Sequence, residues 1–349
     1  MKTFPFALPL SIALALPTWA ADTTAIPVPR IEIARFAGNR VAAVSYTFDD
    51  GTMGHYTVAA PTLERYGFRG TFGVIVRKTA DDPDAAAKLA TAGGKNDARR
   101  ISWQEWRELA ARGHEVANHG LDHRGLPALT EPELEREVED ARRIVTEKVG
   151  RPLTFIYPGN GRNPRVRDFV LRNHIAARDR EERFGGPGFS VEKANGIVDK
   201  AIKAGQSIVI MSHAVAEVGY QPVSREELDG HLQYVSTLKD RIWVDTLANV
   251  ARYVRARDSA TVQIQRSESE SVTYALASPL DPVVFNAPLT CLIQAGGPLI
   301  SASARRGPGG VALPATVSGN QVLVDVVPGP GSVTVRWTRM SGPARSTRP

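Results

Sequence analysis

Two adjacent carboxylates, Asp49 and Asp50, follow the apolar segment 41–48 and precede Gly51. Like charges this close repel each other, so both stay ionised only beside a partner charge such as a metal ion. An ordinary Asp-Gly turn that leaves a strand is the structural alternative, because both residue types are common in turns. The pair is therefore a candidate for acid–base or metal chemistry that needs support from other residues.

Two histidines supply that support. His119 and His123 stand four residues apart in the segment Asn-His-Gly-Leu-Asp-His. One turn of helix would place both imidazoles on the same side. Such a pair suits Zn²⁺, which binds neutral imidazole and carboxylate and keeps a position for water. The alternative is two exposed loop histidines, because this spacing often occurs by chance.

Two further segments carry single candidates. His213 ends the apolar run 208–212, and an imidazole at a strand end suits general-acid work near neutral pH. A histidine buried beneath a helix is the alternative. Gly159 lies in a Gly/Pro turn at 157–161 whose backbone N–H groups could bind an oxyanion, although an ordinary turn has the same composition.

The surrounding segment 40–257 alternates apolar runs with amphipathic stretches. Capping boxes predict helix starts after Ser102, Thr130 and Ser224, and Asp245 is the expected N-cap of another helix. This alternation predicts an α/β fold with a parallel sheet, open or closed into a barrel. Ligands bind at the carboxyl ends of such strands, where all the candidates fall. The expected strands are residues 41–48, 70–76, 154–157 and 207–212.

The pattern changes on both sides of this segment. Beyond residue 258, short β-rich runs at 261–265, 271–275, 321–327 and 332–337 predict a small sandwich. Residues 1–20 have the basic start, short apolar core and small-residue end of a secretory signal peptide, with an N-terminal anchor as the alternative. The expected division is a signal peptide at 1–20, a barrel at 27–257 and a β-rich accessory domain at 258–345. Residues 79–99 are expected to form a long surface loop.

Composition limits the chemistry. One Cys in 349 residues excludes a disulfide framework and a cysteine zinc cluster, so a metal site must use His and carboxylates. The net charge is +6, from 43 Lys and Arg against 37 Asp and Glu. Because the basic residues are scattered, we expect no nucleic-acid partner. No segment outside the first residues is apolar enough to predict membrane insertion.

The motifs in this order resemble the polysaccharide deacetylase family (carbohydrate esterase family 4, the NodB-homology domain). The family's Thr-Phe-Asp-Asp-Gly motif matches residues 47–51, and its His-[Ser/Thr]-x-x-His motif matches His119 and His123. Its late Leu-x-His motif is similar to residues 210–213. The resemblance covers about residues 40–257 and implies an irregular (β/α) barrel with parallel strands. The expected sandwich lies outside it.

Carried over by position, the resemblance implies a role for each candidate. Asp49 would be the general base and His213 the general acid, with the Gly159 N–H as an oxyanion donor. Asp50, His119 and His123 would bind a divalent metal, with Zn²⁺ expected first and Co²⁺ or Ni²⁺ as alternatives. Metal-bound water, its pKa lowered toward ~7, would attack an acetyl carbonyl.

Three departures from the family pattern concern the substrate pocket more than the metal centre. Gly120 replaces the Ser or Thr that follows the first metal-binding His. The third motif lacks its Arg, and Arg162 is a candidate to reach back toward Asp49. The fourth motif, Asp-x-x-x-Trp, is absent, and Arg178 and Asp179 stand where it is expected.

The sequence thus predicts an exported, periplasmic or secreted metal-dependent hydrolase that removes acetyl groups from an extracytoplasmic carbohydrate. Its partner would be that acetylated glycan, with amide or ester linkage left open. A catalytically silent carbohydrate-binding relative is the alternative, and the intact set of five Asp and His residues argues against it. A phosphoesterase would need Arg or Lys beside the metal motifs, where only Arg124 stands.

Overall fold

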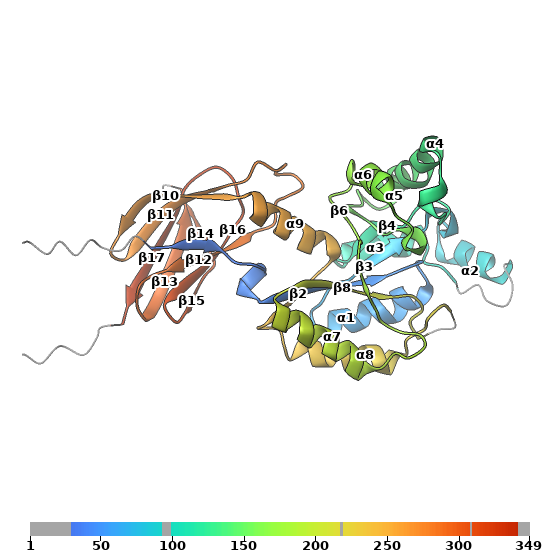
Figure 1. The fold of residues 1–349 in the computed structure, drawn as a ribbon, viewed down its shortest axis with the longest axis horizontal. Helices are drawn as coiled ribbons and strands as arrows, with labels where there is room; N and C mark the ends of the chain where they lie inside the picture. The colour runs from blue at the N-terminus through green and yellow to red at the C-terminus, as the bar shows by residue number, and fades with distance from the viewer. Residues whose placement is uncertain (1–28, 93–98, 217–218, 308, 341–349) are drawn as a thin grey trace, which may run out of the picture.

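The computed structural model describes residues 29–92, 99–216, 219–307 and 309–340. Figure 1 shows a barrel-like part with helices and an all-strand part, with helix α9 (Leu247–Ser259) between them. The predicted signal peptide lies outside the described residues. Among the helices of the described ranges, none combines the length and apolar character needed to cross a membrane.

A curled sheet of eight parallel strands forms the first part. Its order is β6-β5-β4-β3-β2-β8-β7, and β9 also pairs with β2. Laid flat, β6 and β7 would lie about 29 Å apart. Residues 178–181, which join them, span about 17 Å at most. The sheet must therefore curl, which confirms the predicted irregular barrel. The strands are β2 (Ala42–Phe48), β3 (Thr71–Val74), β4 (Glu115–Asn118), β5 (Thr154–Phe155), β6 (Ala176–Ala177), β7 (Glu182–Arg183), β8 (Ser207–Ser212) and β9 (Ile242–Val244).

The helices around this sheet begin where the sequence places most of their caps. Ser102 and Ser224 form capping boxes with Glu105 and Glu227. Thr130 does the same with Glu133. In Figure 1, α7 and α8 cover one side of the sheet and α4 to α6 the other. The helices are α1 (Ala60–Arg65), α3 (Trp103–Ala111), α4 (Glu131–Leu134), α5 (Ala141–Lys148), α6 (Pro164–Leu171), α7 (Val191–Ala204) and α8 (Arg225–Ser236).

Two local predictions were wrong. The N-cap of α9 is Thr246, whose side chain accepts from Asn249 N, because Asp245 still donates its N–H to Val44 O in the sheet. The expected surface loop at 79–99 contains helix α2 (Pro83–Ala92). Asp82 accepts from the Ala85 N–H at its start, a helix signal that the apolar pattern alone does not reveal.

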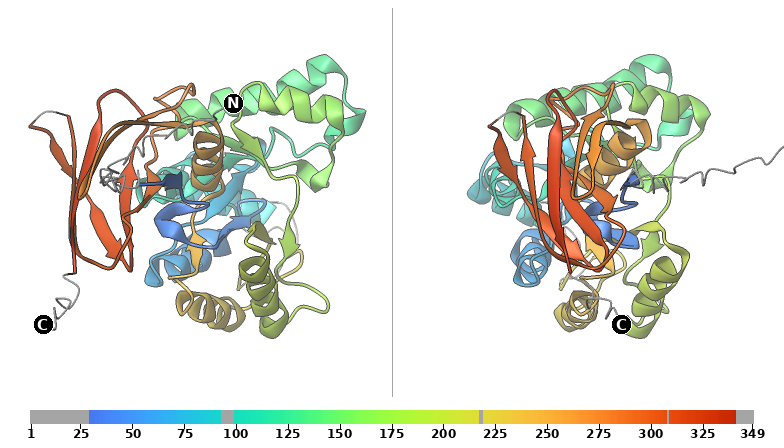
Figure 2. Two further views of the ribbon diagram at one scale, coloured as in Figure 1. Left: turned by 60° about the vertical axis from the view of Figure 1, so that its left-hand side comes forward. Right: turned by 90° about the vertical axis from the view of Figure 1, so that its left-hand side faces the viewer.

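Two antiparallel sheets make up the all-strand part, as predicted, and the left view of Figure 2 shows them in orange and red beside the barrel. One sheet has the order β1-β12-β16-β15 and the other β10-β11-β17-β13-β14. Cys291 is buried between them. The strands are β1 (Ile31–Ile33), β10 (Thr261–Glu268), β11 (Ser271–Ala277), β12 (Leu289–Gln294), β13 (Leu299–Arg306), β14 (Val311–Leu313), β15 (Ala315–Ser318), β16 (Gln321–Val326) and β17 (Val333–Arg339).

The N-terminal strand and α9 connect the two parts. β1 pairs with β12, so residues assigned by sequence to the barrel join the sandwich. The Tyr253 hydroxyl of α9 donates to Ala34 O at 2.8 Å and accepts from Thr290 N at 3.4 Å. The domain division at residue 258 stays a prediction.

Buried neutral histidines predict acid sensitivity. Burial lowers the pKa of His231 to about 4, below its ordinary value of 6.5, and the ring bonds Tyr46 and Asn195. The unfolded chain therefore takes up a proton first as the pH falls, so stability present at neutral pH is lost between about pH 6.5 and 4. We expect His231 to contribute about 1.4 kcal/mol of lost stability per pH unit in that window.

Urea unfolding at pH 7, 6 and 5, in the presence of a chelator, measures this slope. His231→Gln, which cannot titrate, should show a shallower loss than the parent protein. Equal slopes for the two proteins would contradict the expectation.

Candidate active site

The six residues predicted from sequence meet in one cleft of about 440 Å³ at the carboxyl ends of the strands. Parallel pairing explains why. Phe48 of β2 lies beside Ser212 of β8, so Asp49 and His213 follow at the same level, and Asp49 N donates to Ser212 O at 3.0 Å. The predicted residues in the cleft wall are Asp49, Asp50, His119, His123, Gly159 and His213.

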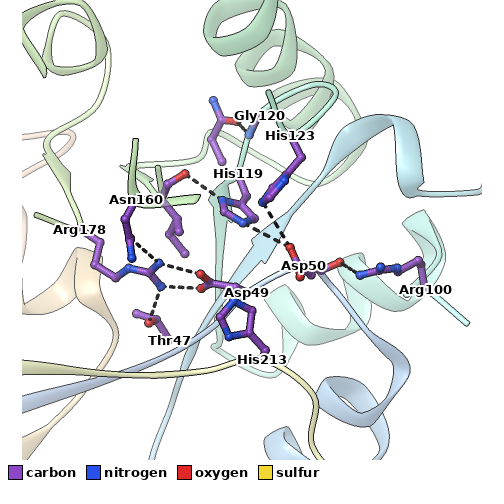
Figure 3. Close-up of polar contacts among 12 residues, drawn as sticks. Thr47, Asp49, Asp50, Arg100, His119, Gly120, His123, Asn160, Arg178 and His213 are labelled. Carbon is purple, nitrogen blue, oxygen red and sulfur yellow. Dashed lines mark hydrogen bonds and ion pairs between the residues drawn. The ribbon is translucent and has the colours of Figure 1, made fainter. Parts of the chain in front are cut away.

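Asp49 forms a buried, bidentate ion pair with Arg178 (Figure 3). Arg178 Nη1 donates to Asp49 Oδ1 at 2.5 Å and Nη2 donates to Oδ2 at 2.6 Å. Nη1 also donates to Thr47 Oγ1 at 3.0 Å. Burial raises the pKa of Asp49, but the charge and hydrogen bonds of Arg178 outweigh it and hold the pKa below its ordinary value. Asp49 is therefore an ionised carboxylate with a fixed orientation.

Sequence reasoning missed this partner of Asp49. The prediction that Arg162 reaches toward Asp49 was wrong, because Arg162 donates to the backbone oxygens of Asn160 and Asp179. Arg178 directly follows β6, and the segment 178–181 crosses the open side of the barrel. The only local signal for Arg178 was a basic residue directly after the apolar run 175–177. Its side chain points inward because segment 178–181 crosses between the two edge strands, which depends on the order of strands in the sheet.

Asp50, His119 and His123 bring one ligand atom each to a common point. Asp50 Oδ1 lies 3.5 Å from His119 Nε2 and 3.5 Å from His123 Nε2. All three ligand atoms lie within 4.8 Å of one another. A tetrahedral Zn²⁺ with ligands at about 2.0–2.2 Å would separate them by roughly 3.3–3.6 Å. The spacing therefore fits a divalent ion.

The environment of the two imidazoles also fits a metal. His119 Nδ1 donates to Ile156 O at 2.9 Å, which leaves Nε2 as the ring nitrogen nearest Asp50, and this buried atom has no hydrogen-bond partner among the described residues. Burial, with His119 as a neighbour, lowers the pKa of His123 to about 4, so its ring is neutral near pH 7. Two imidazoles and a carboxylate form a ligand set for Zn²⁺, Co²⁺ or Ni²⁺.

The prediction that a helical turn aligns the two histidines was wrong. After β4 the side chain of Asn118 accepts from Gly120 N at 3.0 Å, which turns the chain into a loop instead of a helix. The rings then meet edge to face, 4.7 Å apart. Asp50 and His123 both have positive φ, at 77° and 64°. Such strained non-glycine residues concentrate at functional sites.

His213 is held from behind by another histidine. His55 is buried, and its Nε2 donates to His213 O at 2.5 Å. The His213 ring lies edge-on to Tyr220 at 4.8 Å, and Tyr220 is 66% exposed at the cleft rim. Burial lowers the pKa of His213, against the opposing charges of Asp49 and Asp50.

Gly159 also lines the cleft, with φ of 57°, beside Asn160. The Asn160 side chain donates to Glu181 at 2.5 Å and accepts from Arg178 at 3.4 Å. This turn therefore belongs to the same polar network as the Asp49–Arg178 pair. Trp106, by contrast, packs under the turn at Gly51 as a core residue.

Part of this chain is similar to known polysaccharide deacetylases and to a polysaccharide lyase. The polysaccharide deacetylase family model matches residues 38–174. A gellan lyase from Bacillus sp. is 23% identical over 344 residues, which are 87% of this chain and 13% of that protein. The Bacillus subtilis protein YxkH, by its name a polysaccharide deacetylase, is 27% identical over 116 residues, 33% of this chain and 36% of YxkH. The chain thus spans a minor part of both relatives.

Solved structures are similar at low identity. A family 4 acetyl xylan esterase from Clostridium thermocellum, solved with a cobalt ion, is 19% identical and superposes with a TM-score of 0.40. That superposition covers 60% of this chain and 89% of the esterase.

The buried Asp49–Arg178 pair predicts a large stability effect. Arg178→Met would leave an uncompensated buried carboxylate, so we expect the free energy of unfolding to fall by about 3–5 kcal/mol. Adding Asp49→Asn to that variant should recover most of the loss. Urea unfolding with a chelator present measures both, and the exposed neighbour Arg162→Met serves as the control, with a loss below about 1 kcal/mol. A fully stable Arg178→Met protein would disprove the pairing.

Proposed function

Because residues 38–174 belong to the polysaccharide deacetylase family, we propose that the protein is a metal-dependent hydrolase that removes acetyl groups from an extracytoplasmic carbohydrate. One observation carries the proposal: the ionised Asp49 lies beside the convergent ligand set, and His213 follows the neighbouring strand into the same cleft. A protein that only bound glycan would need neither a base nor an acid there. This argues against the catalytically silent alternative.

Asp50, His119 and His123 would hold the metal. When bound, a divalent ion supplies Lewis-acid chemistry, polarising a carbonyl and lowering the pKa of a coordinated water toward ~7. The chain's own contribution is to keep the three ligands deprotonated and oriented. The His119 N–H···O=C bond to Ile156 fixes that ring, and Arg100 Nη1, which donates to Asp50 O at 2.7 Å, fixes the Asp50 backbone.

Asp49 is the general base in this proposal. Its two oxygens are fixed by Arg178, so the carboxylate enters the reaction ionised and oriented to accept a proton from the attacking water. Arg178 does not take the proton. It is a positioning residue that stabilises the negative charge of Asp49.

His213 is the general acid in this proposal. Its ring lines the cleft beside Asp49, and the protonated imidazole would hand a proton to the leaving amine or alkoxide. The Gly159 N–H is the proposed oxyanion donor. The exposed ring of Tyr220 beside His213 offers an apolar face to a sugar at the rim.

The substrate class rests on the family and on the names of the relatives. Both curated relatives are named for polysaccharides, which supports a polymer or oligosaccharide as substrate. The signal peptide expected at 1–20 supports export. The amide and ester versions of the reaction need the same residues, so experiment must separate them.

Acetate release from two panels tests the proposal. N-acetylated chitooligosaccharides and O-acetylated xylooligosaccharides are incubated with the protein, with and without a chelator. We expect release from one panel, removed by the chelator and restored by Zn²⁺ or Co²⁺. Acetate release at the same rate with and without the chelator would contradict metal dependence. No acetate release from either panel by the metal-bound protein would contradict the acetylated-glycan assignment.

Two substitutions separate base from ligand. Asp49→Asn should lower kcat at least about 100-fold yet keep the metal, because Asp49 lies outside the ligand set. His119→Ala should lose both metal and turnover. Mass spectrometry measures the metal content of each variant, and turnover is measured as acetate released from the panel that the parent protein hydrolyses. Asp229→Asn, whose carboxylate pairs with Arg65 outside the cleft, is the matched control. Full metal retention and activity in His119→Ala would refute the ligand assignment.

A further inference from the structure

The loop that carries both histidines is fixed by a buried carboxylate from another element. Glu137 is 1% exposed and belongs to the π-helical segment Glu135–Asp140. Its Oε1 accepts from Asp122 N and from Arg124 N, both at 3.0 Å, and its Oε2 lies 3.2 Å from Asp122 N. The Glu137 backbone oxygen also accepts from Leu121 N at 3.0 Å. The backbone N–H groups before and after His123 therefore both donate hydrogen bonds to Glu137.

Gly120 makes this approach possible. A Cβ at position 120 would lie 2.7 Å from Glu137 Oε1, and Gly120 has φ of 88°, a conformation that side chains rarely adopt. The Ser or Thr of the family pattern is missing at this position. The carboxylate of Glu137 occupies the space next to it and binds the loop N–H groups.

The strand that leads into the loop contacts the same segment. The Asn118 side chain donates to Val138 O at 2.9 Å, one residue beyond Glu137, while its own oxygen accepts from Gly120 N. Short π-helical segments inside α-helices are rare and often lie at functional sites. Here two consecutive residues of the π-helical segment contact the site. Glu137 offers its carboxylate to the loop, and Val138 offers its backbone oxygen to Asn118.

We propose that Glu137 is the positioning residue of the metal site, and that Gly120 gives its carboxylate room to reach the loop. Its charge-assisted hydrogen bonds set the path of residues 119–124 and with it the separation of the two imidazoles. Removing such a supporting contact typically costs 10–100-fold in metal affinity. This inference rests on the proposed metal ligands and concerns binding, not turnover.

Glu137→Gln is the direct test. It keeps the side-chain volume and one acceptor oxygen, but it removes the negative charge and places an N–H₂ donor where Oε2 lies 3.2 Å from the Asp122 N–H. We therefore expect Zn²⁺ affinity to fall about 10–100-fold in competition with a chromophoric chelator. The visible spectrum of the Co²⁺-loaded protein should change, because the imidazoles shift. At saturating metal, kcat should return toward the parent value.

Glu139→Gln is the matched control. Glu139 is a buried carboxylate on the same segment that pairs with Arg142 and makes no contact with the loop. Parent-like Zn²⁺ affinity and Co²⁺ spectrum in Glu139→Gln, with both changed in Glu137→Gln, would support the proposal. Unchanged metal binding in Glu137→Gln, or equal losses in both variants, would overturn it.

Gly120→Ala tests the same contact from the other side and decides the matter if Glu137→Gln fails to fold. The added methyl must displace the Glu137 carboxylate, so affinity should again fall, and parent-like affinity would overturn the proposal. A parent protein that binds no metal would instead refute the proposed ligand set itself. Tight metal binding without acetate release would leave the positioning role standing and refute only the proposed reaction.

Discussion

A carboxylate buried at the end of a central strand stays ionised only beside a compensating cation, and here the same short segment supplies that cation and closes the barrel. Residues 178–181 cross from one edge of the sheet to the other. The first of them, Arg178, turns inward onto Asp49 with two hydrogen bonds and is 1% exposed. The curl of the sheet and the ionisation of the proposed base are therefore coupled. A sheet that failed to curl would leave Asp49 without a partner.

The convergence of the site was predictable because parallel strands end at one edge of their sheet. Asp49 follows β2 and His213 follows β8, which are both expected strands, so the sequence alone placed these two residues at one edge. His119 follows β4 (Glu115–Asn118), which was not among the expected strands. The capping boxes at Ser102, Thr130 and Ser224 were equally local, and each begins a helix. These predictions needed no knowledge of how distant segments cross.

The features that could not be predicted from the sequence depend on contacts between segments that are distant along the chain. The partner of Asp49 is set by which strands form the two edges, and Arg162 was as plausible by spacing as Arg178. The path of the loop between the histidines is set by hydrogen bonds to Asn118 and Glu137, which lie on separate elements. Its departure from a helix therefore has no local sequence signal. β1 joins the sandwich through pairing with a strand some 260 residues later, which no periodicity reveals.

The family-matched segment 38–174 holds the proposed ligands and base but ends before the groups that complete the cleft. Arg178, Glu181, His213 and Tyr220 all come from the chain beyond it. The proposed metal ligands can therefore be recognised from the sequence motifs, whereas Arg178, which pairs with the proposed base, and Tyr220 at the cleft rim belong to the later part of the chain. Because three protein ligands and a base leave substrate choice open, the features that distinguish this protein from its relatives should lie in that second half of the barrel. The absent third-motif Arg illustrates this, because Asp49 pairs instead with Arg178, which directly follows β6 and lies beyond the matched segment.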